Sequence, residues 1–213
     1  MVALRTYAIA LATAGLIAAG GGTALAAPAG GTDTAGSATA AVSRFDDGSF
    51  EYPLAPANRF TTYAAGQSIG PWRVGAGGVD LIGAGFWQAA EGDQSVDLNS
   101  GNPGSVAQTF TTTPGRAYTV TYALAGNTGG AHGPNNPVVK TGRVLLDGQV
   151  FQDFSFDVSN ATTADMGYVR RQVTFEASRA TTTLTFASTT PGAYGPAIDD
   201  VRVSTCCSCA CPG

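Results

Sequence analysis

Three carboxylates near the two ends of the strand-rich region have the chemistry of a cation site. Glu51 stands near its start, and Asp199 and Asp200 stand near its end. If the first and last strands of a sandwich pair, carboxylates from both ends converge and supply oxygen ligands for calcium. Strand parity groups Asp199 with Val201 and Val203, so Asp199 points inward and needs a partner. We therefore predict a structural calcium at Glu51 and Asp199. Asp200 has the opposite parity and is the weaker ligand, nearer to a surface charge.

The alternative for these carboxylates involves no metal. In it, Glu51 is solvated and Asp199 accepts only backbone N–H bonds. The sequence alone leaves both interpretations open.

A second set of residues offers the aromatic faces and polar partners that sugars require. The segment 126–140 is too rich in turn residues for a regular strand and is predicted to form a polar lip. Large aromatics dominate sandwich interiors, so a core position competes with a sugar-binding role for Trp87, as it does for Trp72. His132, the only histidine, has an ordinary loop position as its alternative. The predicted carbohydrate-binding residues are Tyr63, Trp87, Asn127, His132 and Tyr194.

One catalytic motif is present in form only. Residues 66–70 read Gly-Gln-Ser-Ile-Gly, which fits the G-x-S-x-G pattern of serine hydrolases. A nucleophile elbow leads from a strand into a helix, whereas Pro71-Trp72 follows here and no helical pattern lies downstream. The spacing of the acidic residues does not favour a glycosidase pair either. We predict no catalytic residue and no enzyme activity.

Alternating patterns predict the elements that position these residues. Apolar residues recur at every second position over 118–124, 154–158, 173–175 and 184–186, which is typical of half-buried strands. Pro114-Gly115, Asp147-Gly148 and Pro191-Gly192 mark turns between them. No window carries a helical stripe. The fold class predicted is all-β, a single antiparallel β-sandwich or jelly roll over residues 44–204.

The N-terminal region predicts an exported protein. Residues 1–26 hold one cation, Arg5, an apolar run and the small residues Ala24-Leu25-Ala26, as a signal peptide does. A retained N-terminal anchor is the alternative, but the run falls short of the roughly 20 strongly apolar residues that a span needs. Residues 27–43 are nearly all Ala, Gly, Thr and Ser and are predicted to be a flexible leader. We expect a secreted protein, extracellular or cell-wall associated, with no transmembrane span in the mature chain.

The charge balance argues against nucleic acid as a partner. The chain has 11 basic and 15 acidic residues, and removal of Arg5 leaves 10 basic residues against the same 15 acids. No Lys or Arg cluster stands out in the sequence, so a nucleic-acid partner is not expected. Charged residues make up only 12% of the chain, which suits a hydroxyl-rich surface.

Seven blocks in order carry a family resemblance. The chain resembles the bacterial choice-of-anchor C family, and the resemblance covers essentially the whole predicted domain. It implies a galactose-binding-like β-sandwich, similar to plant cell-wall proteins of unknown function and to carbohydrate-binding modules, in which a structural calcium lies between a Phe-Glu and an Asp-Asp-Val. It implies no established activity. The blocks are 48–51, 69–74, 78–82, 87–89, 92–98, 124–127 and 195–201.

All four cysteines lie in the tail, residues 205–213. Cys206, Cys207, Cys209 and Cys211 could pair among themselves, although such close spacing gives awkward disulfide geometry. They could also bind zinc or copper(I) as thiolates. Given the variable termini of the family it resembles, an attachment or processing role is favoured.

The combined prediction is a secreted, non-catalytic module that binds a cell-wall or matrix polysaccharide. The alternative is a structural or adhesive cell-surface protein, attached through its tail and without sugar specificity. Neither the glycan nor the oligomeric state follows from the sequence.

Overall fold

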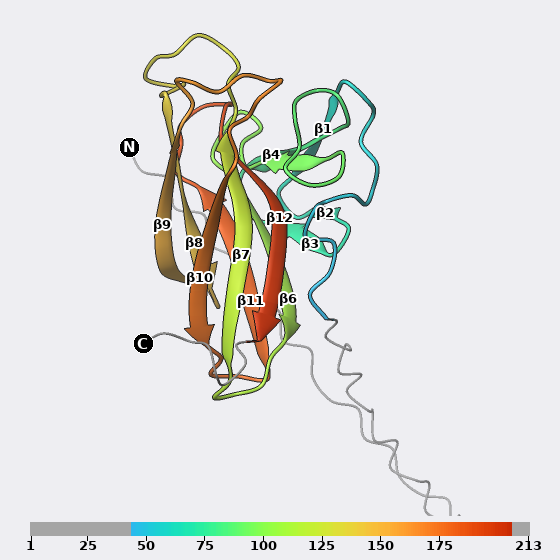
Figure 1. The fold of residues 1–213 in the computed structure, drawn as a ribbon, viewed down its shortest axis with the longest axis vertical. Coiled ribbons are helices and arrows are strands. Elements are labelled where there is room, and N and C mark those ends of the chain that lie inside the picture. Colours follow the sequence, from blue (N-terminus) through green and yellow to red (C-terminus); the bar gives the residue numbers. More distant parts are fainter. Residues whose placement is uncertain (1–43, 206–213) are drawn as a thin grey trace, which may run out of the picture. The chain divides into compact units, whose positions relative to one another are not determined.

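Two antiparallel sheets of six strands each make up the computed structural model, which describes residues 44–205 (Figure 1). The predicted signal peptide, leader and cysteine cluster lie outside these residues. Sheet A has the order β1 (Phe60–Ala64), β4 (Gly78–Ile82), β5 (Ser95–Asp97), β12 (Pro196–Thr205), β7 (Ala117–Gly126) and β10 (Val169–Glu176). Sheet B has the order β2 (Ser68–Ile69), β3 (Trp72–Val74), β6 (Ser105–Thr111), β11 (Thr181–Ser188), β8 (Val139–Leu146) and β9 (Gln149–Asp157). The predicted all-β sandwich is confirmed.

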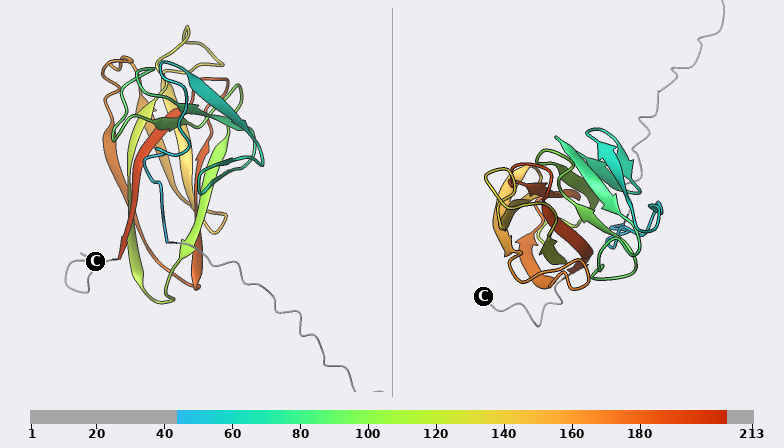
Figure 2. Two further views of the ribbon diagram at one scale, coloured as in Figure 1. Left: turned by 90° about the vertical axis from the view of Figure 1, so that its right-hand side faces the viewer. Right: turned by 90° about the horizontal axis from the view of Figure 1, so that it is seen from above.

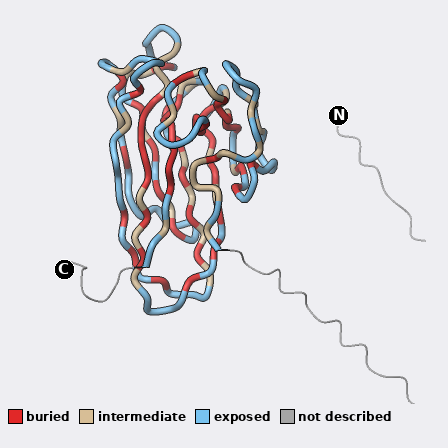
Figure 3. The backbone as a smooth tube through the Cα atoms, turned by 45° about the vertical axis from the view of Figure 1, so that its right-hand side comes forward, coloured by how far each residue is buried: buried red, intermediate tan, exposed pale blue. Residues whose placement is uncertain are grey.

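The alternating patterns place the strands as predicted. In β7 the apolar residues at 118, 120, 122 and 124 are buried, whereas the threonines between them are partly exposed. Asp147 and Gly148 join β8 to β9 with φ angles of 49° and 80°, as a two-residue hairpin turn requires. Figure 2 shows the two layers from the side and from above, and Figure 3 shows buried and exposed positions alternating along the long strands.

Trp72 lies in the middle of the core between the sheets, as the core interpretation expected. It is fully buried, and its ring centroid lies 5.0 Å from that of Phe50, 5.6 Å from that of Phe45 and 6.2 Å from that of Phe186. Its indole N–H donates to the carbonyl oxygen of Asp47 at 2.8 Å. Burial of these rings fixes the segment that precedes β1 against the sandwich.

The first and last strands do not pair, contrary to the sequence prediction. β1 pairs with β4, and β12 lies between β5 and β7. The segment before β1 nevertheless reaches β12, because the N–H of Val201 donates to the carbonyl of Gly48 at 2.8 Å. The two ends of the domain are therefore neighbours through a loop rather than through paired strands.

A second, smaller hydrophobic cluster covers the upper outer face of sheet A. It consists of Ile82, Trp87, Ala125, Met166 and Ala197, with Phe86, Phe156 and Tyr168 packed around them. Ala125 and Ala197 face each other across β7 and β12. The loop 83–94 and the loop 158–168 pack over this face, and these loops build the candidate site.

Candidate functional site

Asp199 faces the outer side of sheet A, not the main core as parity predicted. Its neighbour Ile198 belongs to the main core, and Asp199 itself pairs with Ala123 of β7. A β-bulge between Asp199 and Arg202, with φ of 44° at Asp200, then changes the parity and returns Val201 to the core. A bulge adds one residue to one strand, so a strict two-residue period fails there.

Asp199 and Glu51 hold the two ends of one loop segment. Oδ2 of Asp199 accepts the N–H groups of Ala90 and Glu91 at 2.7 and 3.0 Å, and its Oδ1 accepts the N–H of Asp200 at 2.5 Å. Oε1 of Glu51 accepts the N–H groups of Asp93 and Gln94, both at 2.9 Å. Both predicted carboxylates therefore position residues 90–94.

Gly92 lets this segment pass close to Glu51. Its φ is 62°, in the left-handed region that favours glycine, and a Cβ there would collide with the Glu51 carboxylate. The turn that aims two consecutive N–H groups at Glu51 thus depends on glycine at position 92.

The predicted three-carboxylate metal set is not assembled. Asp200 is 3% exposed, rather than a surface charge, and its carboxylate pairs with Arg170 and Arg202. Within residues 44–205, no group of three or more His, Cys, Asp or Glu side chains is placed to hold a metal ion. Glu51 and Asp199 direct carboxylate oxygens at N–H donors, as in the alternative without metal. Calcium binding by Glu51 and Asp199 stays a prediction.

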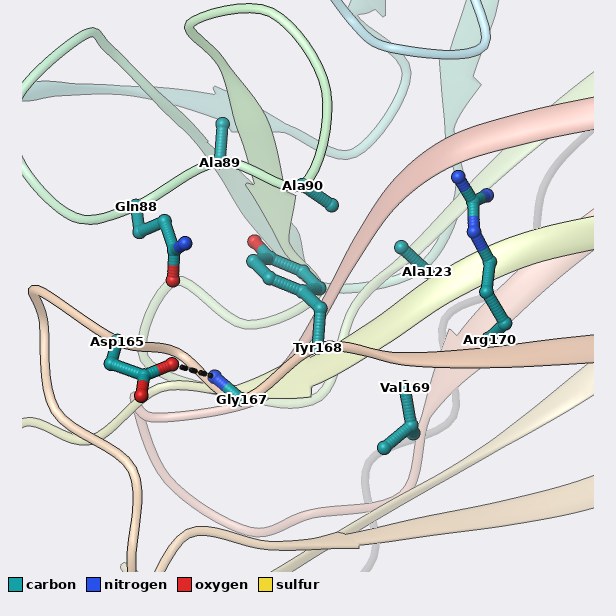
Figure 4. Close-up of a pocket in the computed structure, with 9 residues that line it drawn as sticks. All are labelled: Gln88, Ala89, Ala90, Ala123, Asp165, Gly167, Tyr168, Val169 and Arg170. Carbon is teal, nitrogen blue, oxygen red and sulfur yellow. Dashed lines mark hydrogen bonds between the residues drawn. The ribbon is translucent and has the colours of Figure 1, made fainter.

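A cleft of about 340 Å³ lies beside this loop (Figure 4). Ala89 and Ala90 from the loop, Ala123 from β7 and the ring of Tyr168 give it an apolar lining. Gln88 and Asp165 lie on one side of Tyr168 and Arg170 lies on the other, so amide, carboxylate and guanidinium groups border the same space. The further lining residues are Gly167 and Val169.

Hydrogen bonds tie the walls of this cleft together. Oε1 of Gln88 accepts the N–H of Met166 at 3.0 Å, and the Gln88 N–H donates to the Thr163 carbonyl at 2.8 Å. The Tyr168 hydroxyl is buried, and this burial raises its pKa, while Ser95 opposes the shift. Two loops distant in sequence are thereby fixed to each other, and the cleft is largely preformed.

Two further clefts adjoin the first and extend it in a row. One, of about 480 Å³, shares Gln88 and Ala89 with the first and continues past Phe86, Trp87 and Asp93. The other, of about 370 Å³, shares Arg170 and is otherwise lined by Thr121, Arg171, Gln172 and Arg202. We call these three adjoining clefts the groove. Each of the other two clefts shares lining residues with the first, so the three clefts lie next to one another over the outer face of sheet A.

The sequence-predicted sugar residues do not gather in the groove. Trp87 is 5% exposed and donates its indole N–H to the Ser95 hydroxyl at 2.8 Å, so it contributes to a groove wall and is not an exposed stacking platform. Tyr63 is half-buried in β1 and packs against the main core. Asn127 and Tyr194 meet at Gly129, and the exposed His132 lies in the same loop. A sugar-binding role for Tyr63, Asn127, His132 and Tyr194 stays a prediction.

Asn127 has a structural task in a buried polar network. Its amide Nδ2 donates to Oδ2 of Asp97 at 2.7 Å, while Oδ1 of Asp97 accepts the N–H groups of Asn99 and Gly195 at 2.9 and 3.1 Å. Burial raises the pKa of Asp97 to about 7, and these hydrogen bonds oppose the shift. Asp97 therefore connects three loops at this end of the sandwich.

The serine motif has no catalytic context. Ser68 begins the two-residue strand β2, which forms a hairpin with β3. The argument against a strand-to-helix elbow is thus confirmed. Across residues 44–205 there is also no helix of the length and apolarity that crossing a membrane requires.

Residues 43–204 match the family model described as Protein of unknown function (DUF642). The chain belongs to the DUF642 family. The predicted membership of the choice-of-anchor C family stays a prediction. Among curated proteins, Halomucin of Haloquadratum walsbyi (strain DSM 16790 / HBSQ001) is 30% identical over 149 residues, which cover 68% of this chain and 2% of that protein. This DUF642 chain thus spans a small fraction of that relative.

Several solved carbohydrate-binding modules resemble the DUF642 domain at low scores. A family 35 module from Clostridium thermocellum is 12% identical with a TM-score of 0.43, covering 70% of this chain and 99% of that one. The CBM22-1 xylan-binding domain from Paenibacillus barcinonensis Xyn10C is 16% identical with a TM-score of 0.43, covering 71% and 97%. TmCBM61 in complex with β-1,4-galactotriose is 20% identical with a TM-score of 0.41, covering 63% and 88%.

Proposed function

We propose that this DUF642 domain is a secreted, non-catalytic module that binds a polysaccharide along the groove. The observation that carries the proposal is the row of three adjoining clefts over sheet A. Each has a volume within the range of ligand sites, roughly 300 to 1,000 Å³. A row of adjoining clefts suits an extended chain of sugar units better than a single compact molecule.

The groove lining suits a hydroxyl-rich ligand. Alanine side chains and the ring of Tyr168 provide apolar contact for the faces of a sugar. Gln88, Asp165 and Arg170 add an amide, a carboxylate and a guanidinium, which together donate and accept hydrogen bonds. Shallow sites bury little area, so we expect dissociation constants in the range of about 10 μM to 1 mM.

The test is a substitution that places a large side chain in the groove without breaking the hydrogen bonds that shape it. Ala90 is exposed, and its contact with Asp199 uses only its backbone N–H. Ala90→Phe should therefore abolish retention on xylan, β-1,4-galactan or polygalacturonate while leaving the melting temperature within about 2 °C of the parent, as expected for a surface change.

Ala65→Phe is the matched control. Ala65 is also exposed but lies outside the groove, in the turn after β1, so this variant should bind like the parent. The proposal is wrong if the folded parent retains none of these glycans, or if both variants bind equally well. Release of reducing ends from any glycan would contradict the non-catalytic role.

A further inference from the structure

An exposed aromatic ring lies just beyond one end of the groove. Phe60 begins β1 and is 48% exposed. Its ring centroid lies 5.6 Å from that of Phe86, and Phe86 lines the cleft of about 480 Å³. In the sheet register Phe60 pairs with Ile82, which belongs to the second hydrophobic cluster on the outer face of sheet A. Directly paired residues share a face of the sheet, so Phe60 lies on the groove side.

The contact between the two rings leaves part of Phe60 open to a ligand. The planes of Phe60 and Phe86 make an angle of 83°, an edge-to-face arrangement. Such a contact covers at most one face of a ring, and Phe60 is nearly half exposed. Phe86 in turn lies with its centroid 5.7 Å from that of Trp87, which belongs to the second hydrophobic cluster. Phe60 therefore presents flat apolar surface on a packed support.

A polar amide stands at the same end of the groove. Asn58 is exposed, and its backbone N–H donates to the carbonyl of Ala84 at 2.7 Å. Its Oδ1 lies so close to Gly85 that a Cβ there would come within 2.7 Å of it. Gly85 lines the same cleft as Phe86. Within residues 44–205 no hydrogen bond engages the side-chain amide of Asn58, so it is free to donate to and accept from a ligand.

This aromatic end is opposite the end of the groove at Arg170. The cleft lined by Phe86 shares Gln88 and Ala89 with the middle cleft, which shares Arg170 with the third. β1 and β10 are the two edge strands of sheet A (Figure 1). Neighbouring strands are about 4.8 Å apart, so the five steps from β10 to β1 correspond to about 24 Å along the sheet. A ligand that reaches both ends is longer than one or two sugar units.

We propose that Phe60, with Asn58 beside it, forms a stacking subsite that takes a further sugar unit of a polysaccharide lying in the groove. We call these two residues the Phe60 subsite. The inference rests on the proposed function and deepens it, because it makes the ligand an extended oligosaccharide rather than a short one. The apolar face of a sugar ring packs on Phe60, and the hydroxyls of that sugar hydrogen-bond with the Asn58 amide.

The experiment measures how affinity depends on ligand length. The full chain is titrated with disaccharides and hexasaccharides of xylan, β-1,4-galactan and polygalacturonate. The parent should bind at least one hexasaccharide about tenfold more tightly than the disaccharide of the same polymer. Phe60→Ala should weaken binding of that hexasaccharide about threefold to tenfold, the loss expected for one aromatic contact, and so reduce the gain from length.

Variants separate stacking from general apolar contact. Phe151→Ala is the matched control, because Phe151 is also 48% exposed but lies in β9 of sheet B, and this variant should bind like the parent. Phe60→Tyr keeps the flat ring and should also bind like the parent. Phe60→Leu keeps an apolar side chain without a ring face and should resemble Phe60→Ala. A thermal melt of each variant shows that the domain is folded.

Two failures are distinguishable. Parent-like binding of the hexasaccharide by Phe60→Ala or Phe60→Leu, equal losses in Phe60→Ala and Phe151→Ala, or equal affinity of the parent for disaccharide and hexasaccharide overturns the Phe60 subsite. Each of these results leaves polysaccharide binding standing. Absence of binding to every oligosaccharide and its polymer by the folded parent overturns the proposed function itself.

Discussion

The buried carboxylates of Asp97 and Asp199 accept hydrogen bonds that hold loops in place. Asp97 and Asp199 are both buried, and each accepts three N–H bonds. Hydrogen bonds of this kind compensate part of the cost of burying an ionised carboxyl group. The compensation is incomplete, because burial still raises the pKa of each to about 7.

These raised pKa values predict that stability falls as pH rises from about 5 to 8. Their ordinary value is 3.8, so across this interval the unfolded chain has both groups ionised while the folded domain still binds protons. Ionising the folded groups as pH approaches 8 therefore favours unfolding. Thermal melts at pH 5.5 and pH 8 should show the lower melting temperature at pH 8.

A matched pair of variants checks the cause. Asp199→Asn and Asp97→Asn should each reduce the difference between the two melting temperatures, whereas Asp153→Asn, on the exposed face of β9, should leave it unchanged. A parent melting temperature that is equal or higher at pH 8 contradicts this role of burial.

Residues of the groove illustrate what sequence reasoning missed. Gln88, Asp165, Tyr168 and Arg170 come from two loops and the start of β10, and nothing in their spacing indicates that they meet. The sequence draws attention instead to His132 and Tyr194, because unusual residues in an irregular loop stand out. A site built by packing between distant loops leaves no local pattern to detect.

At the scale of elements, the loop 83–94 forms one wall of the proposed binding surface. It covers the second hydrophobic cluster with Trp87 and is held at 90–94 by Asp199 and Glu51. Of the strands beneath it, β7 follows from the two-residue alternation at 118–124 and was predicted. The loop's position was not, because it depends on the bulge at Asp200, which turns Asp199 outward.

Gly92→Ala should displace this loop and weaken glycan binding at least tenfold. The substitution combines a strained φ with a collision against Glu51, and so costs on the order of 1 to 3 kcal/mol in the folded state. Glycan retention and thermal melts on the same preparation measure both effects.

Gly148→Ala is the control for backbone strain alone. Its φ is 80°, but a Cβ there meets no atom within 4 Å, and it lies in the turn between β8 and β9. It should lower the melting temperature and leave binding unchanged. Equal binding losses in the two variants would show that the loop 83–94 has no special part in recognition.

Thermal melts with and without calcium test the predicted calcium site at Glu51 and Asp199. If calcium binds there, the melting temperature in excess calcium should exceed the melting temperature in chelator by several degrees. The reason is that a ligand at a hundred times its dissociation constant adds about 2.7 kcal/mol to the free energy of unfolding. Asp199→Asn should remove the difference. Coincident melts of the parent would contradict calcium binding and leave the N–H bonds as the role of both carboxylates.

At the scale of the molecule, the sandwich has two separate hydrophobic clusters, one between the sheets and one on the outer face of sheet A. The main core between the sheets, centred on Trp72, provides stability and follows from the sequence pattern. The outer face of sheet A carries the second cluster and the groove, which is the proposed binding surface, and its arrangement depends on topology. Because β10, β7 and β12 adjoin in the sheet but not in the sequence, only the folded chain brings Arg170 and Arg202 together at Asp200.

The most direct test of the groove is amide hydrogen exchange with and without bound oligosaccharide. The full chain is measured with saturating xylan, β-1,4-galactan or polygalacturonate oligosaccharides, whichever it retains. Slower exchange should appear at residues 85–93 and 163–172, which line the groove, with little change at 127–138 and 190–195. Protection confined to 127–138 and 190–195, the loops that hold His132 and Tyr194, would contradict the groove and restore the site expected from sequence.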